Sequence, residues 1–327
     1  MRYRVQERIF TKENASLQTL EFADIPTTNL RAIAARYNLG VNTFAKMPQV
    51  GVINTIYALG DAYVLRVPRA SPATVAQART EAIAAPLAQA AGVRTPRLIT
   101  FAEADDLLPV PYLIYERVQG RTLGLLDWEP AAIVAVWREL GRDLARLHTL
   151  KPGASTTIPL RSEPAGPDPR VLTEERASDG WFSSLEVRWL NRWLDRLAEV
   201  IVRPEAQRIL HLDVQATNIM VGLETLDYKA LLDWGCTGMG DPAFDFFGLP
   251  LRAVPFVLEG HRSIAPLDGD DSVEARILWR HLQFALAVLP RGAAPGMSWG
   301  ERPLAWLLDI FRFFQEPLDP RWQDLRP

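Results

Sequence analysis

The chain has 327 residues, of which 48% are hydrophobic and 23% charged, and its formal net charge is −3. This composition is typical of a globular protein large enough for two compact parts. A slightly acidic chain lacks the basic surface that binds nucleic-acid phosphates, so we expect no nucleic-acid partner. The single cysteine, Cys236, excludes an intramolecular disulfide and a cysteine-rich metal site.

The first residues and the apolar runs bear on location. The opening segment, MRYRVQERIF, carries charges where a signal peptide would be apolar. No uninterrupted apolar run reaches the length that spans a bilayer. We therefore expect a cytoplasmic protein without a membrane partner.

The N-terminal part predicts a small α/β domain. Residues 1–30 are mixed and polar, and we expect an extension there. Residues 31–118 are expected to form an antiparallel sheet with a helix, because two β-like runs flank the turn pair Gly60-Asp61 and Pro72 opens an Ala-rich helical segment. The expected strands are 50–59, 62–67, 96–101 and 112–118, and the expected helices are 31–39 and 72–92.

From residue 119 to 327 the pattern predicts a larger, mainly helical part. Apolar residues at helical spacing predict helices over 129–149 and 181–202, with a Pro-, Gly- and Ser-rich loop over 151–170 between them. The chain is thus of the α+β class, and a ligand is expected in the crevice between its two parts. Short strands are expected at 209–212, 218–221 and 229–232, and helices after Pro242.

Two short segments combine polar side chains with apolar runs. HLDVQATNIMV begins at His211, and LLDWG begins at Leu231. Phosphoryl transfer needs a carboxylate that orients the attacking hydroxyl, and oxygen ligands that hold Mg²⁺. Asp213 fits the first role, Asn218 and Asp233 fit the second, and His211 is expected to support the loop. Each residue alone is equally typical of a turn or a helix cap, but the three together favour catalysis.

These motifs resemble those of a known family. H-x-D-x-x-x-x-N followed by D-W-G is similar to the catalytic and metal loops of the aminoglycoside phosphotransferase family, relatives of the protein kinases. GMGDPAFDF resembles the family's G-D-P-x-x-D run and implies that Asp245 braces the catalytic loop, and ELGRDLARLH, which ends at His148, resembles the helix behind it. The resemblance covers about residues 48–250 and implies a protein-kinase-like fold with two lobes.

Three N-terminal segments resemble the family's nucleotide-binding lobe. GVINTIYAL resembles the hairpin that covers the nucleotide, YVLRVPR the strand that carries a phosphate-binding cation, and LIYERVQGRTL the hinge that meets the base. The resemblance implies ATP or GTP with Mg²⁺ as cofactors. It implies six nucleotide-binding candidates: Arg66, its helical partner Glu81, Gly51, Asn54, and the hinge residues Glu116 and Val118.

The sequence departs from the family at four points, one of which is that Val214-Gln215 replaces the usual His-Pro-like pair. Arg66 stands where lysine is usual, Leu212 replaces a glycine between the histidine and the aspartate, and the cover loop holds only Gly51. The last two departures keep open a kinase-like protein that binds nucleotide without catalysis.

The resemblance implies a kinase that phosphorylates a hydroxyl of an aminoglycoside-like or other small substrate, with a role in antibiotic resistance. Kinases of choline, homoserine or sugars have the same fold and stay open as alternatives. We expect a monomer or a homodimer.

Overall fold

The computed structural model describes most of the chain. The described residues are 24–48, 54–69, 71–126, 128–151, 161–293, 297 and 302–327. They divide into two compact units. Unit 1 holds the chain up to Ala90, residues 94–119 and the short segment Leu232–Thr237, and unit 2 holds residues 91–93, 120–231 and 238–327.

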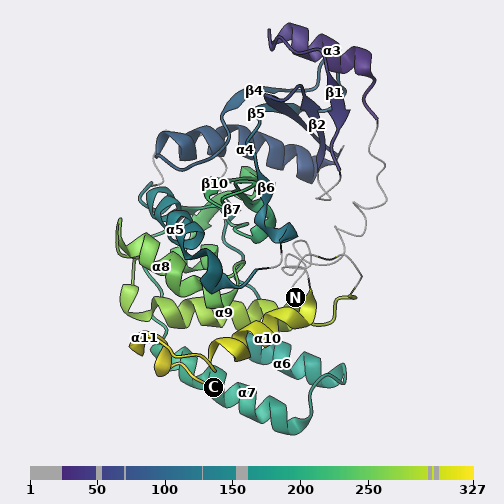
Figure 1. Cartoon of the computed structure of the whole chain (residues 1–327). Helices are drawn as coiled ribbons and strands as arrows, with labels where there is room; N and C mark the ends of the chain where they lie inside the picture. The colour runs from purple at the N-terminus through teal and green to yellow at the C-terminus, as the bar shows by residue number, and fades with distance from the viewer. Residues whose placement is uncertain are drawn as a thin grey trace. The chain divides into compact units, whose positions relative to one another are not determined.

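Unit 1 is built on an antiparallel sheet of five strands in the order β1-β2-β3-β5-β4. Figure 1 labels β1, β2, β4 and β5 of this sheet. Burial alternates along β2, so that Thr55, Tyr57 and Leu59 are buried while their neighbours are half-buried, which is typical of a strand with one face on a core. The strands are β1 (Phe44–Lys46), β2 (Asn54–Leu59), β3 (Tyr63–Pro68), β4 (Leu98–Ala102) and β5 (Tyr112–Glu116), and the helices are α3 (Thr27–Arg36) and α4 (Pro72–Ala90).

The predicted hairpin is confirmed, because β2 and β3 pair from Leu59 and Tyr63 outward and Gly60 has a positive φ of 59° at the turn. Residues 50–53 of the predicted first strand lie outside the described residues. Strand β1 was not predicted, since three residues are too few to show a period. Helix α3 starts at Thr27, before the predicted start at residue 31.

Unit 2 is mainly helical and contains two small sheets. One has the antiparallel order β10-β9-β6, and in the other β11 lies between β7 and β8. The strands are β6 (Arg121–Thr122), β7 (Arg161–Ser162), β8 (Arg208–Leu210), β9 (Ile219–Val221), β10 (Tyr228–Leu231) and β11 (Gly238–Gly240). The helices are α5 (Val134–His148), α6 (Pro169–Ser178), α7 (Ser184–Val200), α8 (Val254–Arg262), α9 (Val273–Val288), α10 (Pro303–Phe313) and α11 (Pro320–Gln323).

Helix α6 was not predicted, and the loop expected over 151–170 extends into it. The helix is mostly polar, and Leu172 is its only fully apolar buried side chain besides Pro169, so its sequence has no clear apolar stripe. The local start signal is nevertheless present, because Asp168 accepts a hydrogen bond from the backbone of Arg170 and Pro169 occupies the first turn.

Two glycines let α5 and α8 pack closely. A Cβ atom on Gly141 would lie 2.0 Å from the carbonyl oxygen of Val257, and one on Gly260 would lie 2.0 Å from that of Arg138. Any side chain at either position would therefore push the helices apart. In the part of the chain that the structure describes, no helix is both long and apolar enough to cross a membrane.

Candidate active site

Asp213 lies in the loop between β8 and β9, and side-chain amides bind both of its carboxylate oxygens. Gln215 donates Nε2–H to Oδ1 at 2.9 Å, and Asn218 donates Nδ2–H to Oδ2 at 2.9 Å. Asn218 also donates to the carbonyl oxygen of Asp213 at 2.9 Å. The carboxylate is therefore held in one orientation while it remains partly exposed.

Asp245 anchors the same loop from η5 (Pro242–Phe246). Its carboxylate accepts hydrogen bonds from the backbone N–H of His211 and of Leu212, each at 2.8 Å. His211 in turn accepts the N–H of Asp213 at Nδ1, at 3.2 Å. Because His211 is fully buried and uses this lone pair within the loop, it positions Asp213.

Leu212 adopts the left-handed conformation, with a φ of 64°. This conformation costs about 1–2 kcal/mol for a residue with a Cβ atom, which explains why a glycine is usual in the resembling motif. Gly238 on β11 makes room for the leucine side chain, since a Cβ there would lie 2.6 Å from Leu212 Cδ1. The absence of a side chain at Gly238 thus leaves space for the side chain of Leu212.

Two further histidines extend the anchor of Asp245. His148 Nε2 lies 3.0 Å from Asp245 Oδ2, and His148 Nδ1 lies 3.1 Å from His261 Nε2. His261 Nδ1 lies 3.0 Å from the carbonyl oxygen of Ala265. Burial is the main cause that lowers the pKa of His261 to about 3, so this ring is neutral.

A second polar cluster lies within unit 1. Arg66 on β3 forms ion pairs with Glu81 on α4 and, from Nη2, with Asp233 Oδ2 at 3.1 Å. Tyr115 on β5 donates its hydroxyl to Glu81 at 3.0 Å. Asp233 has a φ of 67°. The adjacent Trp234 is buried, and its Nε1–H donates to Thr95 at 2.9 Å.

Burial and charge oppose each other in this cluster. Burial is the largest influence on Glu81 and raises its pKa to about 7, although Arg66 acts in the other direction. Burial also disfavours the cation of Arg66, but the attraction of Asp233 and Glu81 outweighs it and raises the pKa of Arg66 further above its usual value. Arg66 is therefore a permanent cation that bridges two carboxyl groups.

The comparisons with known proteins decide the family. The phosphotransferase enzyme family matches residues 46–259, which is well over half of the chain. The chain belongs to this family. The resemblance recognised in the sequence is thereby confirmed, and the protein is a phosphotransferase.

Solved structures of the family show the same fold. Wild-type aminoglycoside 2'-phosphotransferase-IIIa in complex with GDP matches with a TM-score of 0.55 and 16% identity, over 91% of this chain and 97% of that one. A putative aminoglycoside phosphotransferase from Ralstonia eutropha JMP134 gives 0.56 and 17%, over 88% and 99%. The apoenzyme of macrolide 2'-phosphotransferase MphH from Brachybacterium faecium gives 0.54 and 21%, over 89% and 99%. The predicted kinase-like α+β fold is confirmed.

The remaining candidates for nucleotide binding lie in unit 1 or outside the described residues. Asn54 begins β2 and is paired across from Pro68 on β3. Glu116 ends β5, where its N–H donates to the carbonyl oxygen of Arg97 at 3.0 Å, and Val118 follows in the loop. Gly51 lies outside the described residues.

The donor set for Mg²⁺ is chemically suitable. Because the Nδ2 atom of Asn218 donates to Asp213, the Oδ1 atom of the same amide points away from the Asp213 carboxylate. The side chain of Asp233 is 34% exposed. Among the described residues, no three His, Cys, Asp or Glu side chains form a metal cluster. Mg²⁺ commonly binds one or two protein oxygens and completes its shell with phosphate and water, so an amide oxygen and a carboxylate oxygen are each suitable ligands.

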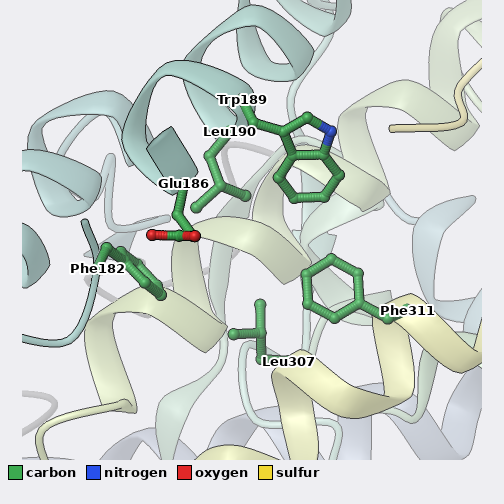
Figure 2. Close-up of a pocket in the computed structure, with 6 residues that line it drawn as sticks. All are labelled: Phe182, Glu186, Trp189, Leu190, Leu307 and Phe311. Carbon is green, nitrogen blue, oxygen red and sulfur yellow. The ribbon is translucent and has the colours of Figure 1, made fainter. Parts of the chain in front are cut away.

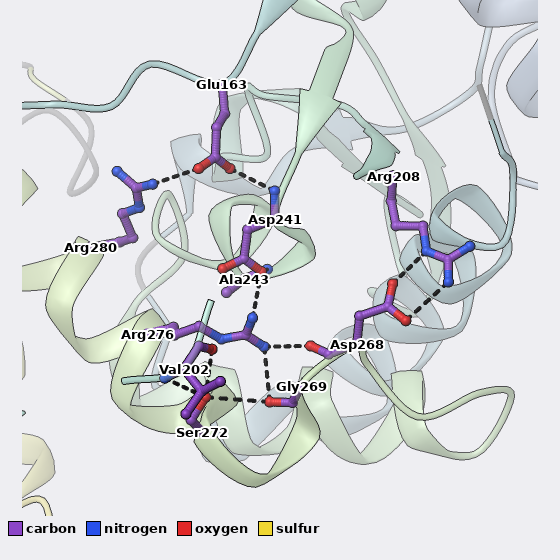
Figure 3. A network of polar contacts seen from close by, with 10 residues as sticks. All are labelled: Glu163, Val202, Arg208, Asp241, Ala243, Asp268, Gly269, Ser272, Arg276 and Arg280. Atoms are coloured by element: carbon purple, nitrogen blue, oxygen red, sulfur yellow. Dashed lines mark hydrogen bonds and ion pairs between the residues drawn. The ribbon is translucent and has the colours of Figure 1, made fainter. Parts of the chain in front are cut away.

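A network of arginines and carboxylates supports the sheet that carries the catalytic loop (Figure 3). Arg280 pairs with Glu163 at 2.7 Å and Arg276 with Asp241 at 3.1 Å. Glu163 also accepts the N–H of Asp241 at 2.8 Å, which ties β7 to the end of β11. Asp241 caps η5 in addition, so its contacts are structural. A cavity of about 380 Å³ lies beside these side chains.

A second cavity of about 340 Å³ lies between α7 and α10 and is mostly apolar (Figure 2). The rings of Trp189 and Phe311 line it with centroids 5.9 Å apart. Glu186 is its one acidic lining residue, and this carboxylate closes a capping box with Ser183. The cavity therefore offers mainly nonpolar surface to a ligand.

Proposed function

We propose that this phosphotransferase is a small-molecule kinase that transfers the γ-phosphate of ATP or GTP to a hydroxyl group, with Asp213 as the catalytic base. The observation that carries the proposal is the fixed, partly exposed carboxylate of Asp213. A base held in one orientation before the substrate arrives is the main contribution that a kinase makes besides charge neutralisation.

In the reaction, the acceptor hydroxyl donates its proton to Asp213 and its oxygen bonds to the γ-phosphorus. The bond between that phosphorus and the bridging oxygen to the β-phosphate breaks, and the nucleoside diphosphate leaves. His211 is fully buried and accepts the backbone N–H of Asp213, so we assign it the role of keeping the loop in place.

Asn218 and Asp233 would hold Mg²⁺, which when bound neutralises negative charge on the phosphates. The chemistry of the two side chains supports this pair, because an amide and a carboxylate supply oxygen ligands of the kind Mg²⁺ prefers.

We place nucleotide binding in residues 31–118 and catalysis with acceptor binding in residues 119–327. Arg66, held by Glu81, supplies the cation for the phosphates, and the backbone of Glu116 and Val118 meets the base. Asn54 and, from the sequence resemblance alone, Gly51 are assigned to nucleotide binding as well. Family structures that contain GDP, ADP and ATP support a nucleotide donor.

The acceptor in this proposal is an antibiotic-like small molecule with a free hydroxyl. Structures of similar fold include phosphotransferase complexes with kanamycin, gentamicin and streptomycin. Another is the apoenzyme of a macrolide 2'-phosphotransferase. An acceptor of this kind would give the protein a role in antibiotic resistance.

Radiolabelled γ-phosphate transfer from ATP and from GTP tests the proposal over a panel of aminoglycosides, macrolides, amino sugars, choline and amino alcohols. We expect transfer to at least one acceptor, and we expect Asp213→Asn to abolish it while nucleotide binding persists. Asp227→Asn is a matched control, because Asp227 is an exposed carboxylate paired with Lys229. Wild-type transfer by the Asp213 variant would refute the assigned base.

The alternative outcome is also measurable. If nucleotide stabilises the protein against heat but neither transfer nor Mg²⁺-dependent hydrolysis occurs, the protein is a nucleotide binder without catalysis. Transfer to choline, homoserine or a sugar alone would keep the mechanism and change the acceptor.

A further inference from the structure

Two of the four histidines, His148 and His261, lie behind the catalytic loop, and a third, His211, lies within it. His148 and His261 are 5% and 1% exposed, and they continue the loop anchor as a row of contacts from Asp245 to the carbonyl oxygen of Ala265. The close packing of α5 and α8 at Gly141 and Gly260 brings the two imidazoles together. Neither ring contacts the residues assigned to the metal.

The contacts along this row determine how many protons the rings of His148 and His261 must carry together. A carbonyl oxygen only accepts, so the contact with Ala265 requires a proton on His261 Nδ1. The contact between the two rings requires one proton between His261 Nε2 and His148 Nδ1. The contact with Asp245 requires a third proton, on His148 Nε2, because this carboxylate already accepts two backbone N–H groups.

Two neutral imidazoles carry two protons on their four nitrogens, whereas these contacts need three. We propose that His148 and His261 act together as positioning residues: they share one extra proton, and their single positive charge pairs with Asp245 and holds the catalytic loop. His148 carries the charge, because it touches the carboxylate. His261 accepts a hydrogen bond from it at Nε2 and donates one from Nδ1–H to the carbonyl oxygen of Ala265. Removal of His261 takes away the partner that stabilises the charged form of His148.

The charged groups around the pair agree with this assignment. Asp245 on η5 is the carboxylate in direct contact, and it is fully buried on its side chain. Further away, His261 faces the charges of Arg262 and Asp270, and Asp268 faces His148. A buried carboxylate with an imidazolium beside it is far less costly than one left unpaired.

His281 provides an internal contrast. Its ring nitrogens face the carbonyl oxygens of Ile277 and Leu249 at 2.9 and 3.0 Å, and burial lowers its pKa. Within the described part of the chain, no carboxylate contacts its ring. We therefore expect His281 to be neutral, because no carboxylate compensates the charge of the second proton that its two carbonyl contacts would need.

Nitrogen-15 NMR of histidine-labelled protein tests the proton count directly. We expect two protonated nitrogens on His148, one on His261 at Nδ1, and one on His281 at neutral pH. The resonances are assigned with His261→Gln and His281→Gln. One proton on each of His148 and His261 would overturn the proposal, and this result is independent of the acceptor and of the proposed function.

Two variants of His261 distinguish a role in positioning the catalytic loop from a role in folding alone. His261→Gln keeps an acceptor and a donor at similar spacing, so we expect near wild-type kcat. His261→Leu removes both, and we expect kcat to fall by about 10- to 100-fold with little change in KM for nucleotide. If both variants lose kcat equally while folded, the hydrogen-bond role is wrong; if His261→Leu does not fold, His261→Gln and the NMR count still decide.

The pH dependence of kcat tests whether the pair carries the extra proton. The anchor is complete only while the extra proton is bound to the pair, so deprotonation at high pH would break the contact with Asp245. We expect kcat to fall on the alkaline side, and the fall to begin at lower pH in His261→Leu than in wild type. An identical alkaline limb in the two proteins would contradict the shared charge. This kinetic arm depends on the proposed function, whereas the NMR arm does not.

Discussion

Asn218 donates its side-chain amide to both the carboxylate and the backbone carbonyl oxygen of Asp213, each at 2.9 Å. One amide group therefore performs two tasks. Its nitrogen fixes the base, and this bond decides which way its oxygen points. The orientation of the amide couples the proposed base to the proposed metal site.

Two substitutions of Asn218 separate these tasks. Asn218→Ala removes both, and we expect kcat to fall by about 100-fold or more and the required Mg²⁺ concentration to rise. Asn218→Asp keeps an oxygen ligand but places a like charge beside Asp213, which raises the pKa of the carboxyl pair. We expect the acid limb of the kcat profile to move to higher pH while Mg²⁺ dependence is retained. If the acid limb of the kcat profile stays in place and the Mg²⁺ dependence of kcat is lost, the Asn218 amide acts on the metal alone.

The bridge from Arg66 to Glu81 and Asp233 predicts an effect of lysine at this position. A guanidinium reaches two carboxylates with its fork, whereas an ammonium is a single point charge. In Arg66→Lys we expect Asp233 to be released and Mn²⁺, as a probe for Mg²⁺, to bind more tightly to the nucleotide-free protein, as measured by electron paramagnetic resonance. Weaker binding would mean that Arg66 assists the metal ligand instead of competing for it.

Removal of the cation is expected to be far more damaging. Arg66→Ala leaves Glu81 and Asp233 without their shared partner, and the Glu81 side chain is only 4% exposed. Breaking a buried pair from one side costs about 3–5 kcal/mol. We expect a loss of this size in the free energy of unfolding measured with urea above pH 7, where Glu81 is ionised. Arg79→Ala is the control, because its ion pair with Glu103 is exposed and should matter little.

Much of the candidate site follows from short sequence spacing. Asp213, Asn218 and Asp233 were recognised because each borders a short apolar run that forms a strand or leads into one. The long helices α5 and α7 have clear apolar stripes at helical spacing, so they were predicted from local pattern alone. Local information suffices where one element carries its own signal.

The histidine pair could not be predicted in this way. His148 and His261 are 113 residues apart, and their contact depends on how α5 packs against α8. The rarity of histidine was the available signal, since the chain has only four. Likewise, the contact of Arg66 with Asp233 depends on segment Leu232–Thr237 grouping with unit 1, which no local pattern shows.

The glycine contact between α5 and α8 predicts a distant effect on the loop. Gly260→Ala puts a methyl group 2.0 Å from the carbonyl oxygen of Arg138, and we expect a loss of about 1–3 kcal/mol in stability. Because His261 is the next residue, we also expect kcat to fall more than KM for nucleotide changes. Gly292→Ala is the control, since nothing lies within 4 Å of a Cβ there. A destabilised protein with unchanged kcat would show that the helix spacing does not reach the catalytic loop.

The raised pKa of Glu81 predicts how stability depends on pH. An unfolded glutamate has a pKa of about 4.3, whereas burial raises the pKa of Glu81 to about 7 in the folded protein. Between these values the folded state binds more protons than the unfolded state, so Glu81 makes the protein more stable at low pH, and this contribution is lost as pH rises to about 7.

Glu81→Gln removes this titration and keeps a neutral side chain of similar size. We expect the free energy of unfolding of wild type to fall relative to the variant by about 2–4 kcal/mol between pH 4.5 and pH 7. Urea unfolding at a series of pH values measures both curves. Parallel curves would mean that Arg66 keeps Glu81 ionised throughout this range, and that the ion pair, rather than burial, sets the charge of the cluster.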